Sequence, residues 1–315
     1  MKIFVTGATG YIGRHLVKKL VNNGHEVTAF IRKSSRAELM SLGVSCVNGD
    51  ITDLQSLQKA MQEAYDAVYH LAASVVPISD ERINLTAAEN LVKVLKNKNI
   101  KKFIYVSTSL VYGNTQKSVS EDYACKPETR YGNQALQIEG IFLEAFRKFQ
   151  LPVVILRPSL VFGGEGGYFG TEYLSGLISG KIPVIGNGEN YRTMTYYGDL
   201  VQALLTSLRT ENIEGEIFNI NTPDTVSTND LTAYIAKNAG VKPPVHIPFF
   251  FAGFLAAIFS LISTIFRSKP LLNGEIVNIA TLNSGEIDIS KARHKLGFIP
   301  KYEMIFQGIR DNYFS

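Results

Sequence analysis

The chain has 315 residues, of which 45% are hydrophobic, and a formal net charge of +4 at pH 7. A chain of this length can bury a large core in one big domain or two unequal lobes. The net charge is mild and the sequence has no basic run, so the composition gives no sign of nucleic-acid binding. Its two cysteines, Cys46 and Cys125, exclude a disulfide framework and are typical of a reducing cytosol. No histidine or cysteine spacing indicates a metal site. The first residues, MKIFVTG, read as a buried strand, so we expect a cytoplasmic protein without a signal peptide.

Short β-branched runs alternate with amphipathic stretches through the first half of the chain. This alternation is typical of an α/β fold, with a parallel sheet covered by helices on both faces. Strands are predicted at residues 2–7, 25–32, 44–50, 66–73, 102–109 and 151–159, and helices at residues 11–24 and 84–99. We predict a Rossmann-type doubly wound sheet in residues 1–160. A smaller C-terminal substrate lobe is predicted in residues 161–315, interleaved with returning Rossmann elements.

Three glycines, Gly7, Gly10 and Gly13, lie between the first strand and the first helix in the sequence TGATGYIG. Glycines at this point allow a tight turn, a close approach of the backbone to a pyrophosphate, and close packing of helix on sheet. The helix N-terminus then offers free N–H groups to the phosphates. This turn, including Tyr11 and Ile12, is therefore predicted to bind a dinucleotide.

The end of the second strand indicates which dinucleotide is bound. A site for NAD usually has an acid there to hold the ribose 2′-hydroxyl, whereas this chain has Ile31 followed by Arg32, Lys33 and Arg36. A basic residue suits the 2′-phosphate of NADP, so NADP(H) is predicted. NAD(H) is the alternative if these residues form only a solvated basic loop.

With these motifs, the chain resembles the extended short-chain dehydrogenase/reductases of the NAD-dependent epimerase/dehydratase superfamily. The likeness runs nearly end to end, through TGATGYIG, NGDITD, HLAA, YVSTSLVYG, YGNQALQIEG, LRPSLVFG, RTMTYYGD and DISKARHKLGFIP. It implies cofactor contacts at Asp50, Ile51, Leu71, Ala72, Ala73, Pro158 and Ser159. It also implies that Thr108 hydrogen-bonds the reacting oxygen of the substrate, with Ser109 as a further substrate contact, and that Tyr131 is the general acid/base.

Position 135 departs from the family pattern. Similar enzymes carry a YxxxK lysine that holds the nicotinamide ribose and lowers the tyrosine pKa, but four residues after Tyr131 this chain has Ala135. Neither Arg130 nor Lys126 has the spacing to replace the lysine. Three hypotheses follow: the alanine is engineered, the natural reaction is a dehydration, isomerisation or cyclisation that needs no tyrosinate, or the protein has weakened redox chemistry or only binds cofactor.

The sequence favours a lipophilic substrate over a nucleotide sugar. Similar nucleotide-sugar enzymes hold the diphosphate with two arginines, and only the first, Arg192, is present, since no arginine precedes Asp288 in NGEIVNIATLNSGEIDISKAR. Arg192 could instead pair with a local acid. The apolar stretch at residues 248–266 resembles the hydroxysteroid dehydrogenase and flavonol- or hopanoid-type reductase branch. We therefore expect an oxidoreductase acting on a lipophilic ketone or alcohol, with a nucleotide-sugar epimerase/dehydratase, a non-redox enzyme and an inactive cofactor-binding protein as alternatives.

The stretch at residues 248–266 contains no charged residue and is followed by Arg267 and Lys269. It is nearly as long as the roughly 20 apolar residues that cross a bilayer, but ordinary soluble sequence returns after it. We expect a buried helix, or one that covers an apolar substrate and touches a membrane surface peripherally. The family likeness also implies a homodimer through long helices that include residues 131–149.

Overall fold

The structure is a computed structural model that describes residues 1–32, 36–73, 82–266 and 272–314. Its centre is a seven-stranded sheet with the order β10-β6-β5-β4-β1-β2-β3, and its neighbouring strands are parallel. The strands are β1 (Lys2–Thr6), β2 (Glu26–Ile31), β3 (Ser45–Asn48), β4 (Ala67–His70), β5 (Lys102–Val106), β6 (Val153–Pro158) and β10 (Ile217–Ile220). The chain order reverses between β1 and β4, and ligands of such sheets bind at the carboxyl ends of the strands beside this point.

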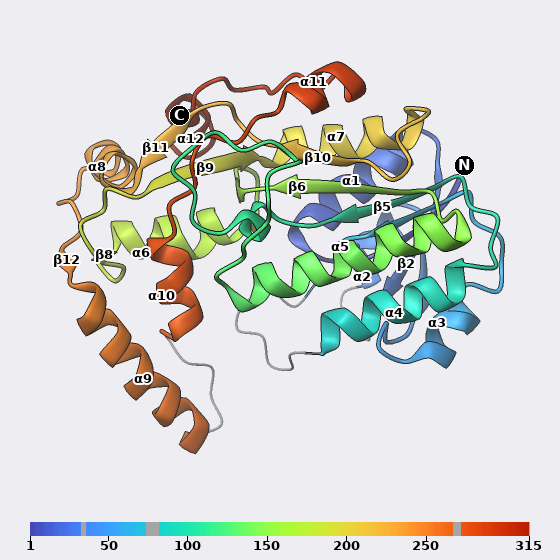
Figure 1. The fold of residues 1–315 in the computed structure, drawn as a ribbon, viewed down its shortest axis with the longest axis horizontal. Coiled ribbons are helices and arrows are strands. Elements are labelled where there is room, and N and C mark those ends of the chain that lie inside the picture. Colours follow the sequence, from blue (N-terminus) through green and yellow to red (C-terminus); the bar gives the residue numbers. More distant parts are fainter. Residues whose placement is uncertain (33–35, 74–81, 267–271, 315) are drawn as a thin grey trace.

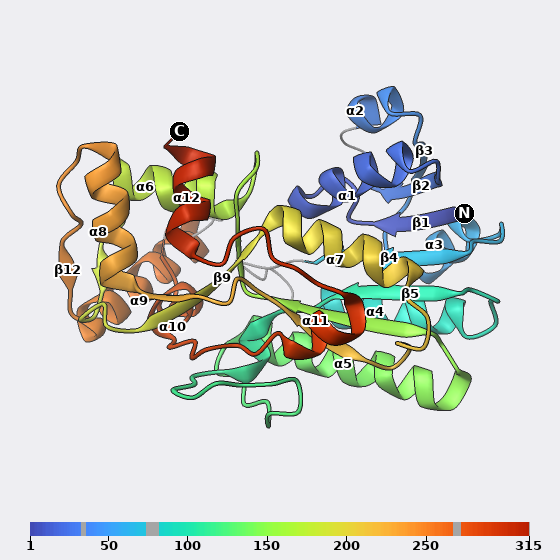
Figure 2. The same ribbon diagram turned by 90° about the horizontal axis from the view of Figure 1, so that it is seen from above.

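Helices cover both faces of this sheet (Figure 2). Side chains alternate between the faces along a strand, so Ile3 and Val5 of β1 enter one buried cluster and Phe4 enters the other. The first face is covered by α1 (Tyr11–Asn22), α2 (Arg36–Ser41), α7 (Tyr197–Arg209) and α11 (Ser290–Leu296). The second face is covered by α3 (Leu54–Ala60), α4 (Ile83–Leu95) and α5 (Arg130–Phe149).

A second lobe is built around a small sheet with the order β11-β9-β7. Its strands are β7 (Leu160–Phe162), β9 (Tyr191–Tyr196) and β11 (Thr225–Ser227), and β8 (Val184–Ile185) pairs separately with β12 (His246–Ile247). The helices of this lobe include η2 (Phe169–Leu174), α6 (Ser175–Ile178), α8 (Thr228–Ala239) and α12 (Ile305–Tyr313). Phe162, Leu231 and Ile309 are fully buried in its core.

Two helices at one end of this lobe differ from the rest. Helix α9 (Phe249–Phe266) projects from the body with α10 (Gly274–Thr281) beside it (Figure 1). The expectation of a buried helix at residues 248–266 is wrong, because the large side chains of α9, such as Phe250 and Phe254, are exposed. Within the described residues, the structure contains no helix whose length and apolar character would let it span a membrane.

The predicted Rossmann-type fold is confirmed. Each of the six predicted strands is present, and the sheet receives its seventh strand, β10, from the second half of the chain. That strand has only four residues and follows a region where the sequence pattern is broken. It brings Asn219 and Ile220 back beside β6, close to the residues predicted to contact the nicotinamide.

Candidate active site

The glycine turn lies at the carboxyl end of β1 and leads into α1. Gly7 has a φ of +76°, and a Cβ there would lie 2.6 Å from the backbone nitrogen of Ala72. A Cβ on Gly13 would lie 2.0 Å from the carbonyl oxygen of Gly7. The turn therefore requires glycine at both positions, and it packs directly on the predicted cofactor segment at residues 71–73. Gly10, the N-cap residue of α1, has no side chain to cap the first N–H groups of the helix, which suits a phosphate at this end.

The predicted adenosine contacts lie where β2 and β3 end. Arg32 is exposed directly after β2, while Lys33 lies outside the described residues and Arg36 begins α2. Asp50 accepts hydrogen bonds from the backbone nitrogen of Thr52 at 2.9 Å and from its hydroxyl at 2.7 Å. These bonds, with a smaller contribution from Arg32, lower the pKa of the Asp50 carboxyl. The adjacent Ile51 is partly buried against the core.

A group of hydroxyls lies at the carboxyl ends of β5 and β6. Thr108 caps the short helix η1 (Ser109–Tyr112), where its Oγ1 accepts a hydrogen bond from the nitrogen of Leu110 at 3.2 Å. Ser159 follows Pro158, and its hydroxyl donates a hydrogen bond to the Ser109 hydroxyl at 2.8 Å. The nitrogen of Ser159 donates to side chains on β9 and after β10, which fixes its position. The structure thus brings Ser109 and Ser159 together, although the sequence places them 50 residues apart.

Tyr131 lies in the first turn of α5, next to the Thr108 segment. A Cβ on the following residue, Gly132, would lie 2.6 Å from the carbonyl oxygen of Leu110, so the glycine permits close contact between α5 and η1. Burial raises the pKa of the Tyr131 phenol to about 12, and none of the described cations opposes this effect. Tyr131 is therefore a neutral phenol at physiological pH.

The first turn of α5 is held by a residue that sequence reasoning missed. Both carboxylate oxygens of Glu275, on α10, accept hydrogen bonds from the backbone nitrogens of Arg130 and Tyr131, each at 3.0 Å. The Thr129 side chain caps the same turn by accepting from the nitrogen of Gly132 at 3.0 Å. A carboxylate at a helix N-terminus is stabilised by the helix dipole. The second lobe therefore helps to position Tyr131.

Ala135 lies in an apolar environment. Its side chain is 2% exposed and packs in a cluster with Val111, Tyr112, Val119 and Ile287. One turn further along α5, Glu139 pairs with the buried Arg157 of β6, whose guanidinium donates to both carboxylate oxygens of Glu139, at 2.9 and 2.6 Å. Because this charge is paired, Arg157 does not act on Tyr131 as the family lysine would. Arg130 and Lys126 are exposed.

The guanidinium of Arg192 lies between β9 and α10. It donates to the hydroxyl of Thr228 at 3.1 Å and to the carbonyl oxygens of Ile279, at 3.3 Å, and Ala280. Among the described residues it forms no ion pair, so the alternative that it pairs with a local acid is not supported. Burial lowers the pKa of Arg192, and the nearby phenols of Tyr173 and Tyr168 oppose this effect.

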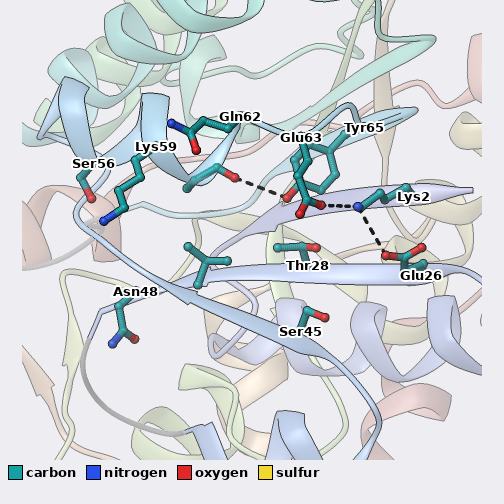
Figure 3. Close-up of a pocket in the computed structure, with 12 residues that line it drawn as sticks. Lys2, Glu26, Thr28, Ser45, Asn48, Ser56, Lys59, Gln62, Glu63 and Tyr65 are labelled. Carbon is teal, nitrogen blue, oxygen red and sulfur yellow. Dashed lines mark hydrogen bonds and ion pairs between the residues drawn. The ribbon is translucent and has the colours of Figure 1, made fainter.

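Two recesses lie at opposite ends of the parallel strands, and only the smaller one borders the glycine turn. A pocket of about 480 Å³ lies at the amino ends of β1, β2 and β3, where Lys2 pairs with Glu26 at 3.5 Å and with Glu63 (Figure 3). None of the predicted cofactor residues lines it, and its Lys2 is paired. A smaller recess of about 170 Å³ borders the glycine turn at Ala8 and Thr9, as a cofactor site requires.

The chain belongs to the NAD dependent epimerase/dehydratase family, whose model matches residues 3–221. It is 24% identical over 311 residues to the N-acetyl-alpha-D-glucosaminyl-diphospho-ditrans,octacis-undecaprenol 4-epimerase of Escherichia coli O157:H7, covering 96% of this chain and 91% of that protein. It is 29% identical to the UDP-N-acetyl-alpha-D-glucosaminuronate decarboxylase of Bacillus cytotoxicus, covering 79% and 84%. The crystal structure of UDP-glucuronic acid 4-epimerase from Bacillus cereus in complex with NAD superposes with a TM-score of 0.75 at 27% identity, covering 99% and 100%.

These findings confirm the superfamily that the motifs predicted, and the protein is an NAD(P)-dependent enzyme of the epimerase/dehydratase type. The hydroxysteroid dehydrogenase and flavonol- or hopanoid-type branch is not supported, because the three relatives are named for sugars on a diphosphate. The comparisons support the alternative of a nucleotide-sugar epimerase/dehydratase better than the expected enzyme for a lipophilic ketone or alcohol. The roles assigned to Thr108, Tyr131 and Ala135 stay predictions.

Proposed function

We propose that the protein reduces a keto group on a diphosphate-linked sugar, using a nicotinamide dinucleotide. The observation that carries this proposal is the environment of Tyr131, which lies beside the Thr108 segment and is half-buried, so that desolvation raises its pKa to about 12. A phenol that keeps its proton at neutral pH is a competent acid for a nascent alkoxide, which is a stronger base than phenolate. It is a poor base for removing a proton from an alcohol, since only about one phenol in 10⁵ is ionised at pH 7.

The glycine turn fits the cofactor. The backbone around Gly7 and Gly13 is packed too closely for side chains, and the uncapped N-terminus of α1 faces the place where a pyrophosphate would lie. When bound, the nicotinamide supplies the hydride for the reduction. Pro158 and Ser159 would lie beside it, and Leu71, Ala72 and Ala73 would line its cleft.

Thr108 and Tyr131 have different roles at the reacting oxygen of the substrate. The Thr108 hydroxyl would hold the carbonyl oxygen by a hydrogen bond, and the Tyr131 hydroxyl would deliver the proton as that oxygen becomes an alkoxide. Glu275 and Thr129 hold the backbone of the first turn of α5, so they position the phenol. These two residues act through Tyr131 rather than on the substrate.

Arg192 supports a diphosphate as the substrate handle. Its guanidinium has only neutral partners among the described residues, so a half-buried positive charge is available to an anion beside Tyr168 and Tyr173. Arginine suits such a group because its planar fork matches phosphate oxygens. The Arg192→Lys variant should raise KM for a diphosphate-linked substrate more than it lowers kcat.

The direction of the reaction tests the proposal. With UDP-linked 4-keto sugars and NADPH or NADH, we expect turnover at pH 7. Oxidation of the matching hydroxy sugars should be slow at pH 7 and should rise about tenfold for each pH unit as Tyr131 ionises. Oxidation with a pH-independent rate above pH 7 would contradict the acid/base assignment, and turnover of lipophilic ketones alone would contradict the substrate class.

The preference for NADP(H) is also our proposal, because Arg32 is exposed after β2 and no carboxylate stands at Ile31. Titration of NADPH and NADH by fluorescence tests it. The Arg32→Ser variant should lose about tenfold in NADPH affinity and leave NADH affinity unchanged. Tighter binding of NADH by the unaltered protein would remove Arg32 from this role. The cytoplasmic location and the homodimer through residues 131–149 stay predictions.

A further inference from the structure

Helix α9 packs against the body with its small side chains. Ala252 and Ala256 are buried and contact a cluster that includes Ile185 of β8 and Val277 of α10. At about 100° of rotation per residue, the exposed side chains from Phe250 to Ile262 project mainly from the opposite side of the helix. An ordinary surface helix has the reverse arrangement, with its large apolar side chains turned towards the core.

The outward face of α9 holds a large share of the exposed apolar side chains. Among the residues whose side chains the structure describes, 17 large hydrophobic residues are exposed, and seven of them belong to this one helix. They are Phe249, Phe250, Phe251, Phe254, Ile258, Leu261 and Ile262. A contiguous exposed patch of this kind marks a binding surface, because single apolar residues, rather than groups, are what water-facing surfaces normally show.

The charged residues in the sequence that flanks α9 are all basic. Between Asp230 and Glu275 the sequence has no acid, but it has Lys237, Lys242, Arg267 and Lys269. Removing these four from the 32 Lys and Arg leaves 28, which equals the 28 Asp and Glu. The segment at residues 231–274 therefore carries the whole formal net charge of +4, and Lys237 and Lys242 are exposed.

We propose that α9 lies in the surface of an anionic phospholipid bilayer, with its aromatic face inserted and with Lys237 and Lys242 on the headgroups. An in-plane helix of this kind combines an apolar face with flanking lysine and arginine. The 18 residues of α9 contain no charged residue, and the sequence that flanks them has only basic ones, which an anionic membrane surface matches. A membrane surface therefore fits both the apolar patch and the basic residues in the flanking sequence.

This orientation places the active site next to the membrane. Helix α10 packs along α9, and its Glu275 binds the first turn of α5, which carries Tyr131. A substrate whose diphosphate is attached to a lipid would thus reach the site without leaving the bilayer surface. That consequence rests on the proposed function, whereas membrane binding itself does not and is tested without any substrate.

The absence of tryptophan from the chain allows a direct test. The Phe250→Trp variant has a single tryptophan on α9, at a position that is 77% exposed, and the matched Ile299→Trp variant has one at a position that is 81% exposed, between α11 and α12. Vesicles of phosphatidylglycerol in phosphatidylcholine should shift the Phe250→Trp emission to the blue, and brominated lipid should quench it. The Ile299→Trp emission should stay unchanged, and pure phosphatidylcholine should bind at least about tenfold more weakly.

Two further variants separate the apolar and charged contributions. In the Phe250→Trp background, Phe254→Asp should abolish the blue shift. Lys237→Glu with Lys242→Glu should weaken binding to anionic vesicles about tenfold or more, while the matched pair Lys18→Glu with Lys19→Glu on α1 should not. Unchanged emission with anionic vesicles would overturn the proposal, as would equal binding to neutral vesicles. A blue shift that needs no vesicles and grows with protein concentration would also overturn it, in favour of a second copy of the chain.

Discussion

Helices α5 and α9 are of similar length and both contact α10, yet their apolar residues are distributed in opposite ways. Helix α5 buries Ile138 and Phe142 in the core and exposes polar residues such as Gln137 and Glu144. Helix α9 buries two alanines and exposes phenylalanines. The residues of α5 thus stabilise the fold, whereas most of those of α9 contribute little to it.

The two helices also show how one lobe can affect the other. Glu275 on α10 joins them, because α10 packs on α9 and caps α5. A molecule or surface that binds α9 can therefore act on the turn that holds Tyr131 through a short chain of contacts. The substitutions below test the contrast between the helices and then this link.

The same substitution on the two helices should have very different costs. Phe142→Ala removes a side chain that is fully buried in the core, and we expect a loss of about 3–5 kcal/mol in the free energy of unfolding. Phe250→Ala removes a side chain that is 77% exposed and should change it by less than about 0.5 kcal/mol. Denaturant unfolding of both variants measures the difference. A loss above 1.5 kcal/mol for Phe250→Ala, roughly three times this bound, would show that α9 is buried in solution.

Tyr131→Phe removes the proton donor from the inner face of α5 and keeps the ring. We expect kcat for the reduction to fall by about 10²–10⁴-fold, the usual contribution of a positioned acid, with cofactor affinity unchanged. Tyr123→Phe removes a hydroxyl from an exposed ring and is the control. If Tyr131→Phe kept the full kcat of the unaltered protein, as Tyr123→Phe should, Tyr131 would not be the proton donor.

Ala135→Lys returns the family cation to α5. A cation near the phenol should lower the pKa of Tyr131, and a fall of about two units would raise oxidation at pH 7 about 100-fold. The reduction should change less, because it uses the protonated form. The ammonium would also enter the cluster around Val111 and Ile287, so the melting temperature should fall.

Gln137→Lys adds the same charge on the exposed side of α5 and should change neither rate nor stability. An equal gain in oxidation from both variants would assign the effect to general charge rather than to position 135. No consumption of NADPH or NADH in either variant or in the unaltered protein would favour the non-redox alternative.

Short sequence patterns predicted the strands, the glycine turn and the helix of Tyr131, because each depends on only a few neighbouring residues. The β-branched runs predicted strands because such residues fit a pleated, half-buried surface, and the spacing of Gly7, Gly10 and Gly13 predicted the turn after β1. Tyr131 could be placed on a helix because its motif is continuous in sequence. Each of these features is contained in a window of a few residues.

The features that sequence reasoning missed depend on contacts between distant segments. Glu275 lies 144 residues from Tyr131, and nothing near it indicates that it caps α5. Arg192 was read as half of a diphosphate clamp, but its carbonyl partners on α10 could not be seen in the sequence. Hydropathy identified α9 as apolar without showing which side faces water, since burial depends on what packs against the helix.

The smallest expected effect concerns the link itself. Glu275→Gln keeps the size of the side chain but replaces the carboxylate, whose two oxygens accept hydrogen bonds from the nitrogens of Arg130 and Tyr131, by a neutral amide. One amide oxygen can still accept, so we expect a loss of only about 1 kcal/mol in stability. Glu286→Gln, which alters an exposed carboxylate, is the control for charge. A positioning role also predicts that kcat falls while KM stays constant, because the backbone that carries Tyr131 shifts without touching the substrate. If Glu275→Gln lowered stability and left kcat at the level of the control, the contact would be structural, and α9 would have no path to the active site through α10.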